Sequence, residues 1–364
     1  MLNKDLFPVI TCEGSPYEIG LTHGTQAKKQ IDATIATYKA MFKDYSGIEW
    51  EKAKRYALTF IPAIEAYDKD IMEEIRGIAD GAHYDLEDIL ALNVRSEIVL
   101  QGAQVNKMCD GGCTSFAFIP YKTTTGETLL GQNWDWKMTE QKGMIILHIL
   151  QKDKPDITMV TEAGIVGKIG FNSAGIGVCL NALASDKLVE GQVIPLHIAL
   201  RGVLNSVTLS DAIRSVGIMN LSCCANFTMA SSEGQAVCVE IGPGDIDVIY
   251  ANEGYCCHTN HFYGPRMINV KDTGRIGLPD SYLRLGRIRD LIKHGPEKVD
   301  VPFIKTILRD HVGFPDAICR HEDLSEPKEK RLGTIFSIIM NLEREEMFFA
   351  PGNPCECCYH LYKF

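Results

Sequence analysis

The sequence predicts an α+β fold in which helices and strands occupy separate stretches of the chain. Roughly the first 108 residues carry apolar side chains at helical spacing. From Cys113 onward the chain changes to short alternating runs bounded by turn residues, which are typical of strands. Runs of strands with segregated helices favour a layered architecture over a doubly wound sheet. No internal repeat or low-complexity linker interrupts the 364 residues, so we expect one compact domain.

The N-terminal part is expected to begin with a short strand over residues 1–12. The run Ser15-Pro16-Tyr17-Glu18 is a capping box with proline at the first helical position. It predicts a helix that continues to about residue 45 and bends near Gly20 and Gly24. Helical spacing recurs over residues 51–66, 67–82 and 86–100.

The C-terminal part is expected to consist mainly of strands. They are predicted at residues 114–120, 127–134, 144–152, 156–161, 168–172, 176–182, 225–231, 236–241, 246–250, 254–259, 333–342 and 346–350. Helices are predicted at residues 195–204, 209–216, 281–293 and 301–311.

Composition narrows the class of protein. Hydrophobic residues make up 45% and charged residues 23%, as in ordinary globular enzymes. The net charge of −10 argues against nucleic acid or an anionic membrane as the main partner. No apolar run approaches the ~18 residues of a spanning helix, and Met1–Pro8 lacks the apolar region of a signal peptide. We expect a cytoplasmic protein.

The thirteen cysteines are expected to be mostly reduced thiols. The pairs Cys223-Cys224 and Cys256-Cys257 lie in apolar runs, which favours buried thiols. The tail Cys355-Glu356-Cys357-Cys358-Tyr359-His360 has soft metal ligands, but its spacing is not that of a paired CxxC knuckle. We expect no metal and no cofactor.

Cys113, which follows two glycines, is the predicted nucleophile. An N-terminal cysteine carries its own base, because an α-amino group titrates near ~7.7–8.0. Glycine before it leaves the scissile carbonyl open to attack. The polar stretch 101–110 suits an exposed processing loop. We predict that the chain cuts its own Gly112-Cys113 bond.

Asp135 is the predicted partner of this nucleophile. The alternating runs Thr114–Ile119 and Thr128–Trp134 flank a turn at Gly126 and predict an antiparallel hairpin. Cys113 then starts one strand, Asp135 ends the other, and the carboxylate can orient the thiol or the α-amine.

At this point the chain resembles the isopenicillin N acyltransferase family (acyl-coenzyme A:6-aminopenicillanic-acid acyltransferase), the C45 peptidases of the N-terminal nucleophile hydrolase superfamily. The resemblance runs in order along most of the chain. It covers Glu13–Gly20, His23-Gly24, Glu74–Ala79, Asp110–Thr114, Gly131–Asp135, Thr161–Lys168, Gly170–Gly175, His197–Arg201, His258–His261 and Pro279–Ser281.

The resemblance implies a four-layer αββα fold made as a self-cleaving zymogen. Cleavage would give a mainly helical α-chain or pro-segment, 1–112, and a β-chain with the catalytic core, 113–364, paired as a heterodimer. Penicillin-making members carry a peroxisomal tripeptide at the C-terminus, whereas this chain ends Leu361-Tyr362-Lys363-Phe364.

The resemblance also implies roles for individual residues. Cys113 corresponds to the nucleophile and Asp135 to the aspartate near the nucleophile and the amine substrate. Asn260 resembles the oxyanion-hole asparagine. Arg331 resembles the arginine that meets the substrate carboxylate, and Arg284 resembles an arginine near the nucleophile of bile salt hydrolases.

A second oxyanion donor is expected from a backbone N–H near Asn181. Each assignment has a structural alternative. Cys113 is then a buried thiol, Asp135 a strand-end cap, Asn260 a turn residue, and Arg284 part of a solvated helix face. Arg331 would form a surface pair with Glu329 or Glu343.

These residues predict an enzyme that acts through an acyl-Cys113 intermediate. Its substrates would be a small-molecule acyl donor, either an amide or a coenzyme A thioester, and an amine or water as acceptor. One alternative is hydrolysis of N-acyl amino acids or β-alanyl amides without a role in penicillin synthesis. The other is an unprocessed, inactive homologue that only binds.

Overall fold

A computed structural model describes residues 7–99, 112–187, 193–217, 221–328 and 331–364. The processing loop predicted at 101–110 lies outside the described residues. The chain divides into two compact units, and each draws on separate stretches of sequence. Unit 1 comprises Met1–Met108, Thr139–Ala174 and Lys187–Cys223; unit 2 comprises Cys109–Met138, Gly175–Asp186 and Cys224–Phe364.

Unit 1 holds four strands in the order β1-β4-β5-β6. They are β1 (Val9–Glu13), β4 (Met144–Leu150), β5 (Ile157–Glu162) and β6 (Ile169–Asn172). β1 pairs in parallel with β4, and the other two pairs are antiparallel. β5 and β6 are buried along their whole length, which predicts packing on both faces.

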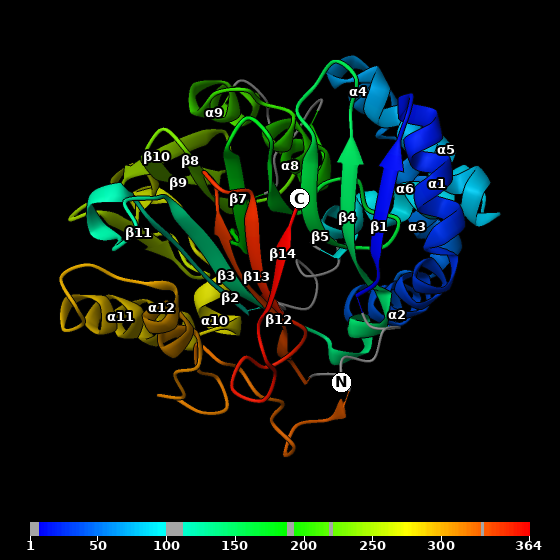
Figure 1. Ribbon diagram of the computed structural model, residues 1–364. Helices are drawn as coiled ribbons and strands as arrows, with labels where there is room; N and C mark the ends of the chain where they lie inside the picture. Colours follow the sequence, from blue (N-terminus) through cyan, green and yellow to red (C-terminus); the bar gives the residue numbers. More distant parts are fainter. Residues whose placement is uncertain (1–6, 100–111, 188–192, 218–220, 329–330) are drawn as a thin grey trace. The chain divides into compact units, whose positions relative to one another are not determined.

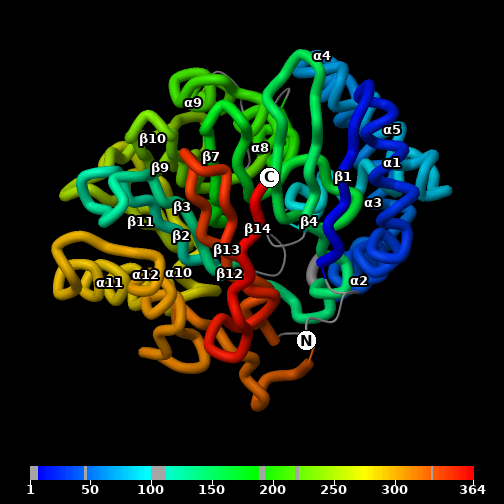
Figure 2. The backbone as a smooth tube through the Cα atoms, in the orientation of Figure 1, coloured from blue at the N-terminus to red at the C-terminus, as the bar shows by residue number. Residues whose placement is uncertain are grey.

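The helices of unit 1 pack beside this strand layer, with α1 against β1 (Figure 2). The helix α2 packs against β4 and β5. The helices of this unit include α1 (Pro16–Gln26), α2 (Lys28–Ser46), α3 (Trp50–Leu58), α4 (Ile61–Tyr67), α5 (Lys69–Ala82), α6 (Leu86–Asn93), α8 (Leu196–Leu204) and α9 (Leu209–Gly217).

The helix expected from residue 16 to about 45 is broken at Ala27, so the predicted bend at Gly20 and Gly24 was wrong. These glycines instead let α1 lie directly on α5. A Cβ at Gly20 would stand 2.0 Å from the backbone oxygen of Glu74, and one at Gly24 would stand 2.3 Å from that of Ile78. Close backbone approach is the reason for glycine here.

Unit 2 contains two stacked layers of strands. The first has the order β7-β8-β9-β10, formed by Ile176–Ala182, Ala225–Ser231, Gln235–Gly242 and Asp245–Tyr250. The second has six strands in the order β11-β2-β3-β12-β13-β14. These are β11 (Tyr255–His258), β2 (Gly112–Phe118), β3 (Leu129–Trp136), β12 (Gly333–Asn341), β13 (Glu346–Ala350) and β14 (His360–Lys363).

The six-stranded sheet is covered by helices on the face opposite β7–β9. The helices of unit 2 are α10 (Gly274–Gly277), α11 (Asp280–Lys293) and α12 (Val301–Leu308). α11 packs on β2 and β11, and Figure 1 shows α11 and α12 together beside these strands. Their shared core includes Phe116 and Phe118 from β2 with Ile288, Ile292 and Ile304 from the helices.

Among the described residues, short 3₁₀ helices at Pro120–Lys122, Met138–Gly143 and Pro265–Asn269 join these elements. The predicted α+β class is confirmed, because strands and helices form separate layers within each unit. Helix-on-sheet and sheet-on-sheet packing are the contacts that the four-layer αββα prediction requires. The cysteines at 223, 224, 256 and 257 are buried thiols, as expected. In the described part of the chain, no helix has the length and apolar character needed to cross a bilayer.

Candidate active site

The predicted hairpin is confirmed by the pairing of β2 with β3. Gly112 lies opposite Asp135, and Cys113 lies opposite Trp134. Directly opposed residues point to the same face of a sheet, and successive residues point to opposite faces. The Asp135 side chain therefore shares the face of Gly112, whereas the Cys113 side chain shares the face of Trp134. The carboxylate lies beside the predicted scissile bond rather than on the face of the thiol.

Glycine is required at position 112 by its contacts. A Cβ there would stand 2.6 Å from Asp135 Oδ2 and 2.9 Å from Arg320 Nε. Any side chain would collide with both charged groups. The residue before the predicted nucleophile is thus held directly against a buried carboxylate and a buried guanidinium.

The backbone of Cys113 is bound by side chains on both sides of its Cα. Its N–H donates to Asn260 Oδ1 at 2.9 Å, just beyond the end of β11. Its carbonyl oxygen accepts from Arg284 Nη1 at 2.8 Å and from Asn181 Nδ2 at 3.2 Å. Cys113 itself is 3% exposed. Contacts of this kind fix the backbone where a nucleophile needs to be positioned.

The orientation of the Asn260 amide follows from its neighbours. Oδ1 accepts a second bond from Arg284 Nη2 at 3.0 Å, while Nδ2 donates to the Ala182 carbonyl at 3.0 Å. Two donors meet at the oxygen and one acceptor meets the nitrogen, so the flipped amide would lose all three bonds. The backbone N–H of Asn260 donates to Ser281 Oγ at 2.7 Å, which secures the loop to α11.

A buried chain of charges connects these groups. Arg284 Nε donates to Asp280 Oδ2 at 2.7 Å, and Arg320 also pairs with Asp280. Arg320 Nε lies 3.5 Å from Asp135 Oδ2, and Thr334 Oγ1 donates to Asp135 Oδ1 at 2.7 Å. Burial raises the pKa of Asp280, but Arg284 and Arg320 outweigh it and the net shift is downward.

Asp135 responds differently to the same arginines. Burial raises the pKa of its carboxyl to about 6, and Arg320, Arg284 and the Thr334 bond offset only part of that increase. Neither Asp135 Oδ2 nor Arg320 Nε has a hydrogen-bond partner among the described residues. A buried carboxylate with a raised pKa, one of whose oxygens makes an ion pair but no hydrogen bond, is a feature of functional sites.

Comparison with known proteins identifies the family of the chain. The sequence model of the family described as "Acyl-coenzyme A:6-aminopenicillanic acid acyl-transferase" matches residues 122–356. The chain is 31% identical over 349 residues to the "Acyl-coenzyme A:6-aminopenicillanic-acid-acyltransferase 40 kDa form" of Emericella nidulans; the match covers 95% of this chain and 92% of the relative. The chain belongs to the acyl-coenzyme A:6-aminopenicillanic acid acyltransferase family. The prediction of an enzyme is thereby confirmed.

Two solved structures are also similar to the chain. One is a mutant of conjugated bile acid hydrolase from Clostridium perfringens, with 14% identity and a TM-score of 0.44; the match covers 69% of this chain and 97% of that chain. The other is penicillin V acylase from Agrobacterium tumefaciens, with 13% identity and a TM-score of 0.42; it covers 66% of this chain and 83% of that chain.

Most site residues predicted for this acyltransferase family member come together in unit 2. Gly112, Cys113, Asp135, Asn260 and Arg284 form one cluster. Asn181 joins it through its side-chain amide, whereas a backbone N–H was expected there. Its Oδ1 accepts from Ser115 Oγ at 2.6 Å and from Asn226 Nδ2 at 2.9 Å, so the amide orientation is fixed.

Arg331 is not brought into this cluster. Its guanidinium donates to the carbonyls of Glu326 at 2.9 Å and Leu324 at 3.1 Å. Arg320, which sequence reasoning missed, is the arginine beside Asp135. Its position directly after the apolar run Ala317–Cys319 was a signal of burial, but nothing local connects that run with Cys113. Asp280 could have been predicted as a site residue from the sequence, since Pro279–Ser281 is one of the family motifs.

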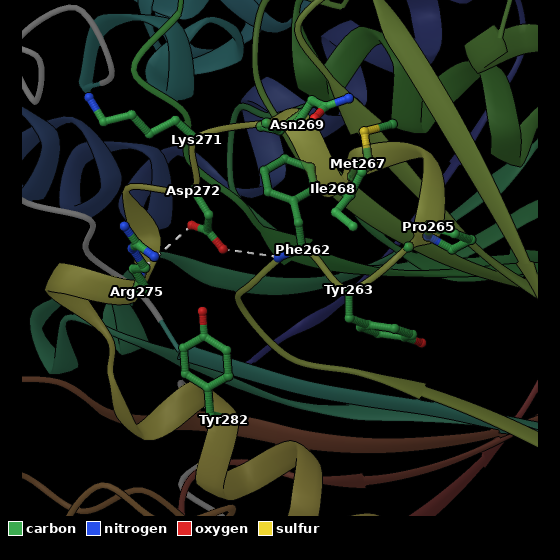
Figure 3. A pocket seen from close by; sticks show the side chains of 12 residues that line it. Phe262, Tyr263, Pro265, Met267, Ile268, Asn269, Lys271, Asp272, Arg275 and Tyr282 are labelled. Carbon is green, nitrogen blue, oxygen red and sulfur yellow. Dashed lines mark hydrogen bonds between the residues drawn. The ribbon is translucent and has the colours of Figure 1, made fainter.

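A pocket of about 520 Å³ opens beside the Asn260 loop (Figure 3). Phe262, Asp272 and Tyr282 line it, and Asp272 accepts from the Phe262 N–H at 3.1 Å. Tyr282 directly follows Ser281, the residue that holds Asn260. The pocket has both aromatic and charged walls, with Lys271 and Arg275 among the latter.

Proposed function

We propose that this protein is an autoprocessed N-terminal cysteine acyltransferase or amidohydrolase. The observation that carries the proposal is the binding of Cys113 N–H to the Asn260 side chain at 2.9 Å. Cleavage of the Gly112-Cys113 bond would turn that nitrogen into an α-amine with an acceptor already beside it. An α-amine titrates near ~7.7–8.0 and is a suitable base for the adjacent thiol.

Self-cleavage would proceed as an acyl shift from nitrogen to sulfur. Cys113 Sγ attacks the Gly112 carbonyl carbon, the C–N bond breaks, and the thiol proton passes to the departing nitrogen. Water then hydrolyses the Gly112 thioester and restores the thiol. Asp135 is assigned the proton transfer at the scissile bond, because it faces Gly112 and its pKa of about 6 lets it hold or release a proton.

The catalytic cycle repeats this chemistry on an external substrate. The Cys113 thiolate attacks the acyl carbonyl of a donor, and the leaving thiol or amine takes the proton. An amine or water then attacks acyl-Cys113, giving an amide or a carboxylic acid. Asn260 and Asn181 are the proposed amide groups of the oxyanion site. In the present arrangement both amide nitrogens are bound to backbone carbonyls, so this role requires an exchange of partners.

Departure of the Gly112 end would free the space over Asp135 and Arg320. We assign to Arg320, in place of Arg331, the contact with the substrate carboxylate, because Arg320 is the buried arginine beside Asp135. An amine acceptor that carries a carboxylate could then place its ammonium on Asp135 and its carboxylate on Arg320. The 6-aminopenicillanic acid in the name of the Emericella relative has both groups, and we propose acceptors of this kind.

Coenzyme A enters this proposal as the leaving group of a donor substrate and not as a bound cofactor. Hydrolysis of an N-acyl amino acid or a β-alanyl amide uses the same steps with water as the acceptor. The proposed mature protein is an α/β heterodimer of 1–112 and 113–364. Its cytoplasmic location remains a prediction.

Trapping of the acyl-enzyme tests the proposed function. Purified protein is mixed with a medium-chain acyl-coenzyme A or with an N-acyl amino acid, quenched in acid and digested for mass spectrometry. We expect the acyl mass on Cys113, and faster loss of the adduct when 6-aminopenicillanic acid is present. Cys179→Ser, a buried thiol on β7, is the matched control and should retain the adduct. Absence of an adduct with both donors, or its persistence in Cys113→Ala, would refute the proposal.

A further inference from the structure

Four metal-binding side chains meet in unit 2 outside the Cys113 cluster. They are His311, Cys319, His321 and Cys355, whose ligand atoms all lie within 4.8 Å of one another. The two imidazole Nε2 atoms are 3.2 Å apart, and the two Sγ atoms are 3.5 Å apart. His321 Nε2 lies 3.3 Å from Cys355 Sγ and 3.7 Å from Cys319 Sγ.

Four of the six ligand separations agree with the edges of a zinc tetrahedron, and the other two, from His311 Nε2 to the sulfur atoms, lie within 4.8 Å. Bonds of about 2.3 Å to sulfur and about 2.05 Å to nitrogen imply ligand separations of roughly 3.8 Å for S···S, 3.3 Å for N···N and 3.5 Å for N···S. The observed values are 3.5, 3.2, and 3.3 and 3.7 Å, respectively. Each differs from its expected edge by a few tenths of an ångström. Two thiolates and two imidazoles in this geometry favour Zn²⁺ among the common divalent metals.

The surroundings are those of a supported metal site. The Cys319 N–H donates to the Asp310 carbonyl at 3.0 Å, which fixes the backbone at this ligand. Asn353 Nδ2 lies 3.8 Å from Cys319 Sγ, and a carboxylate oxygen of Glu356 lies 3.8 Å from His321 Nδ1. Carboxylates commonly accept a hydrogen bond from the second nitrogen of a metal-bound imidazole, and Glu356 lies near enough to His321 for an ion pair, though not for that hydrogen bond. Cys319 is buried, while His311 and Cys355 are exposed, so an ion can enter from solvent.

We propose that His311, Cys319, His321 and Cys355 bind one structural Zn²⁺. Four protein ligands leave no open position, and closed sites of this kind are structural. The sequence does not reveal the site, because only Cys355 comes from the cysteine-rich tail. The other three ligands lie 34 or more residues earlier, as the separation of Cys355 from its nearest partner in sequence shows.

The ion would connect the C-terminal tail to the segment that presents Arg320. Arg320 lies between two of the ligands, Cys319 and His321, and its guanidinium reaches Asp135 and Asp280. The Arg320 carbonyl accepts from Asn353 Nδ2 at 2.6 Å, which is a second connection to the tail. This consequence for the Cys113 cluster rests on the proposed function, whereas metal binding itself does not.

Metal analysis of tag-free protein tests the site. Protein purified under reducing conditions should contain about one zinc per chain, and the apoprotein should take up Co²⁺ with the absorption of a tetrahedral thiolate complex. Cys355→Ser and His311→Ala change exposed ligands and should lose the zinc and the cobalt spectrum. Cys358→Ser, an exposed tail cysteine outside the cluster, is the matched control and should retain both.

Three results would overturn the zinc proposal. One is wild-type protein that binds neither zinc nor cobalt under reducing conditions. Another is zinc content that is unchanged in both ligand variants. The third is a disulfide between Cys319 and Cys355 in reduced preparations, detected by mass. Acyl-adduct formation on Cys113 is measured separately on the same samples. A zinc-free protein that still acylates would therefore contradict only the metal site.

Discussion

Asp135 in unit 2 and Glu162 in unit 1 are both buried carboxylates that face positively charged side chains. Both carboxylate oxygens of Glu162 have partners. Arg95 Nε lies 2.9 Å from its Oε1, the Tyr38 hydroxyl donates to the same oxygen at 2.5 Å, and Lys168 pairs with Oε2. Burial raises the pKa of Glu162, but Arg95 and Lys168 outweigh it and the net shift is strongly downward.

Asp135 retains an oxygen without a hydrogen bond among the described residues, and burial raises its pKa to about 6 despite two nearby arginines. We interpret this difference as that between a carboxylate with a structural role and one suited to proton transfer beside the Gly112-Cys113 bond. A carboxylate whose partners satisfy it is held in one ionisation state and contributes to the fold. A carboxylate that is buried but only partly satisfied can exchange a proton near physiological pH. Chemistry is therefore expected at Asp135 and stability at Glu162.

Substitution of Glu162 should give the largest loss of stability. Glu162→Gln removes the carboxylate that pairs with Lys168 and Arg95, although Glu140 and Glu97 still act on Arg95, and we expect a loss of about 3–5 kcal/mol in the free energy of unfolding. Urea denaturation measures it. Self-cleavage per folded molecule should be unchanged. A loss below about 1 kcal/mol would remove the distinction between the two carboxylates.

Substitution of Asp135 should have the opposite effect, with little change in stability and a large loss of self-cleavage. Asp135→Asn is nearly isosteric and removes a charge that burial disfavours, so stability should change by about 1 kcal/mol or less. Self-cleavage should slow by about 10²-fold or more, because proton transfer at the scissile bond is lost. A time course on denaturing gels measures the rate. Arg331→Ala, outside the cluster, should process at the wild-type rate; equal rates in Asp135→Asn and wild type would exclude Asp135 from the mechanism.

The contributions of the two carboxylates to the free energy of unfolding should change in opposite directions as the pH rises. The folded pKa of Asp135 is raised from 3.8 to about 6, so the folded state binds its proton more tightly and this contribution falls as the pH rises between those values. The folded pKa of Glu162 is lowered, so its contribution is lost as the pH falls below its ordinary value of 4.5. Unfolding curves of wild type, Asp135→Asn and Glu162→Gln across this range would resolve the signs. Identical pH slopes in all three would contradict the comparison.

Local pattern was sufficient to predict the hairpin that carries the site. Alternation over residues 114–119 and 128–134 with a turn at Gly126 gave the β2–β3 pairing, and with it the nearness of Asp135 to the Gly112-Cys113 bond. The same alternation, followed through, also places the Cys113 side chain and the Asp135 carboxylate on opposite faces. The expected contact between carboxylate and thiol therefore becomes a contact between carboxylate and scissile bond.

Contacts between residues that are far apart in the sequence could not be predicted from local sequence patterns. Arg320 meets Asp135 only because the loop that follows α12 crosses the end of β3, and Arg331 looked equivalent from its neighbours in sequence. The four zinc ligands share no periodicity that a helix or strand would reveal. On α1, the glycines were interpreted as a bend because a single sequence does not show the backbone of α5 lying against them.

The mass of the mature protein under denaturing conditions tests the central claim most directly. We predict two chains, with the larger beginning at Cys113, whose masses add up to the 40.4 kDa precursor plus one water. Cys113→Ala should remain a single, inactive chain, and Cys179→Ser should be processed like wild type. A fully active wild-type protein that remains one continuous chain across Gly112 and Cys113 would contradict the account.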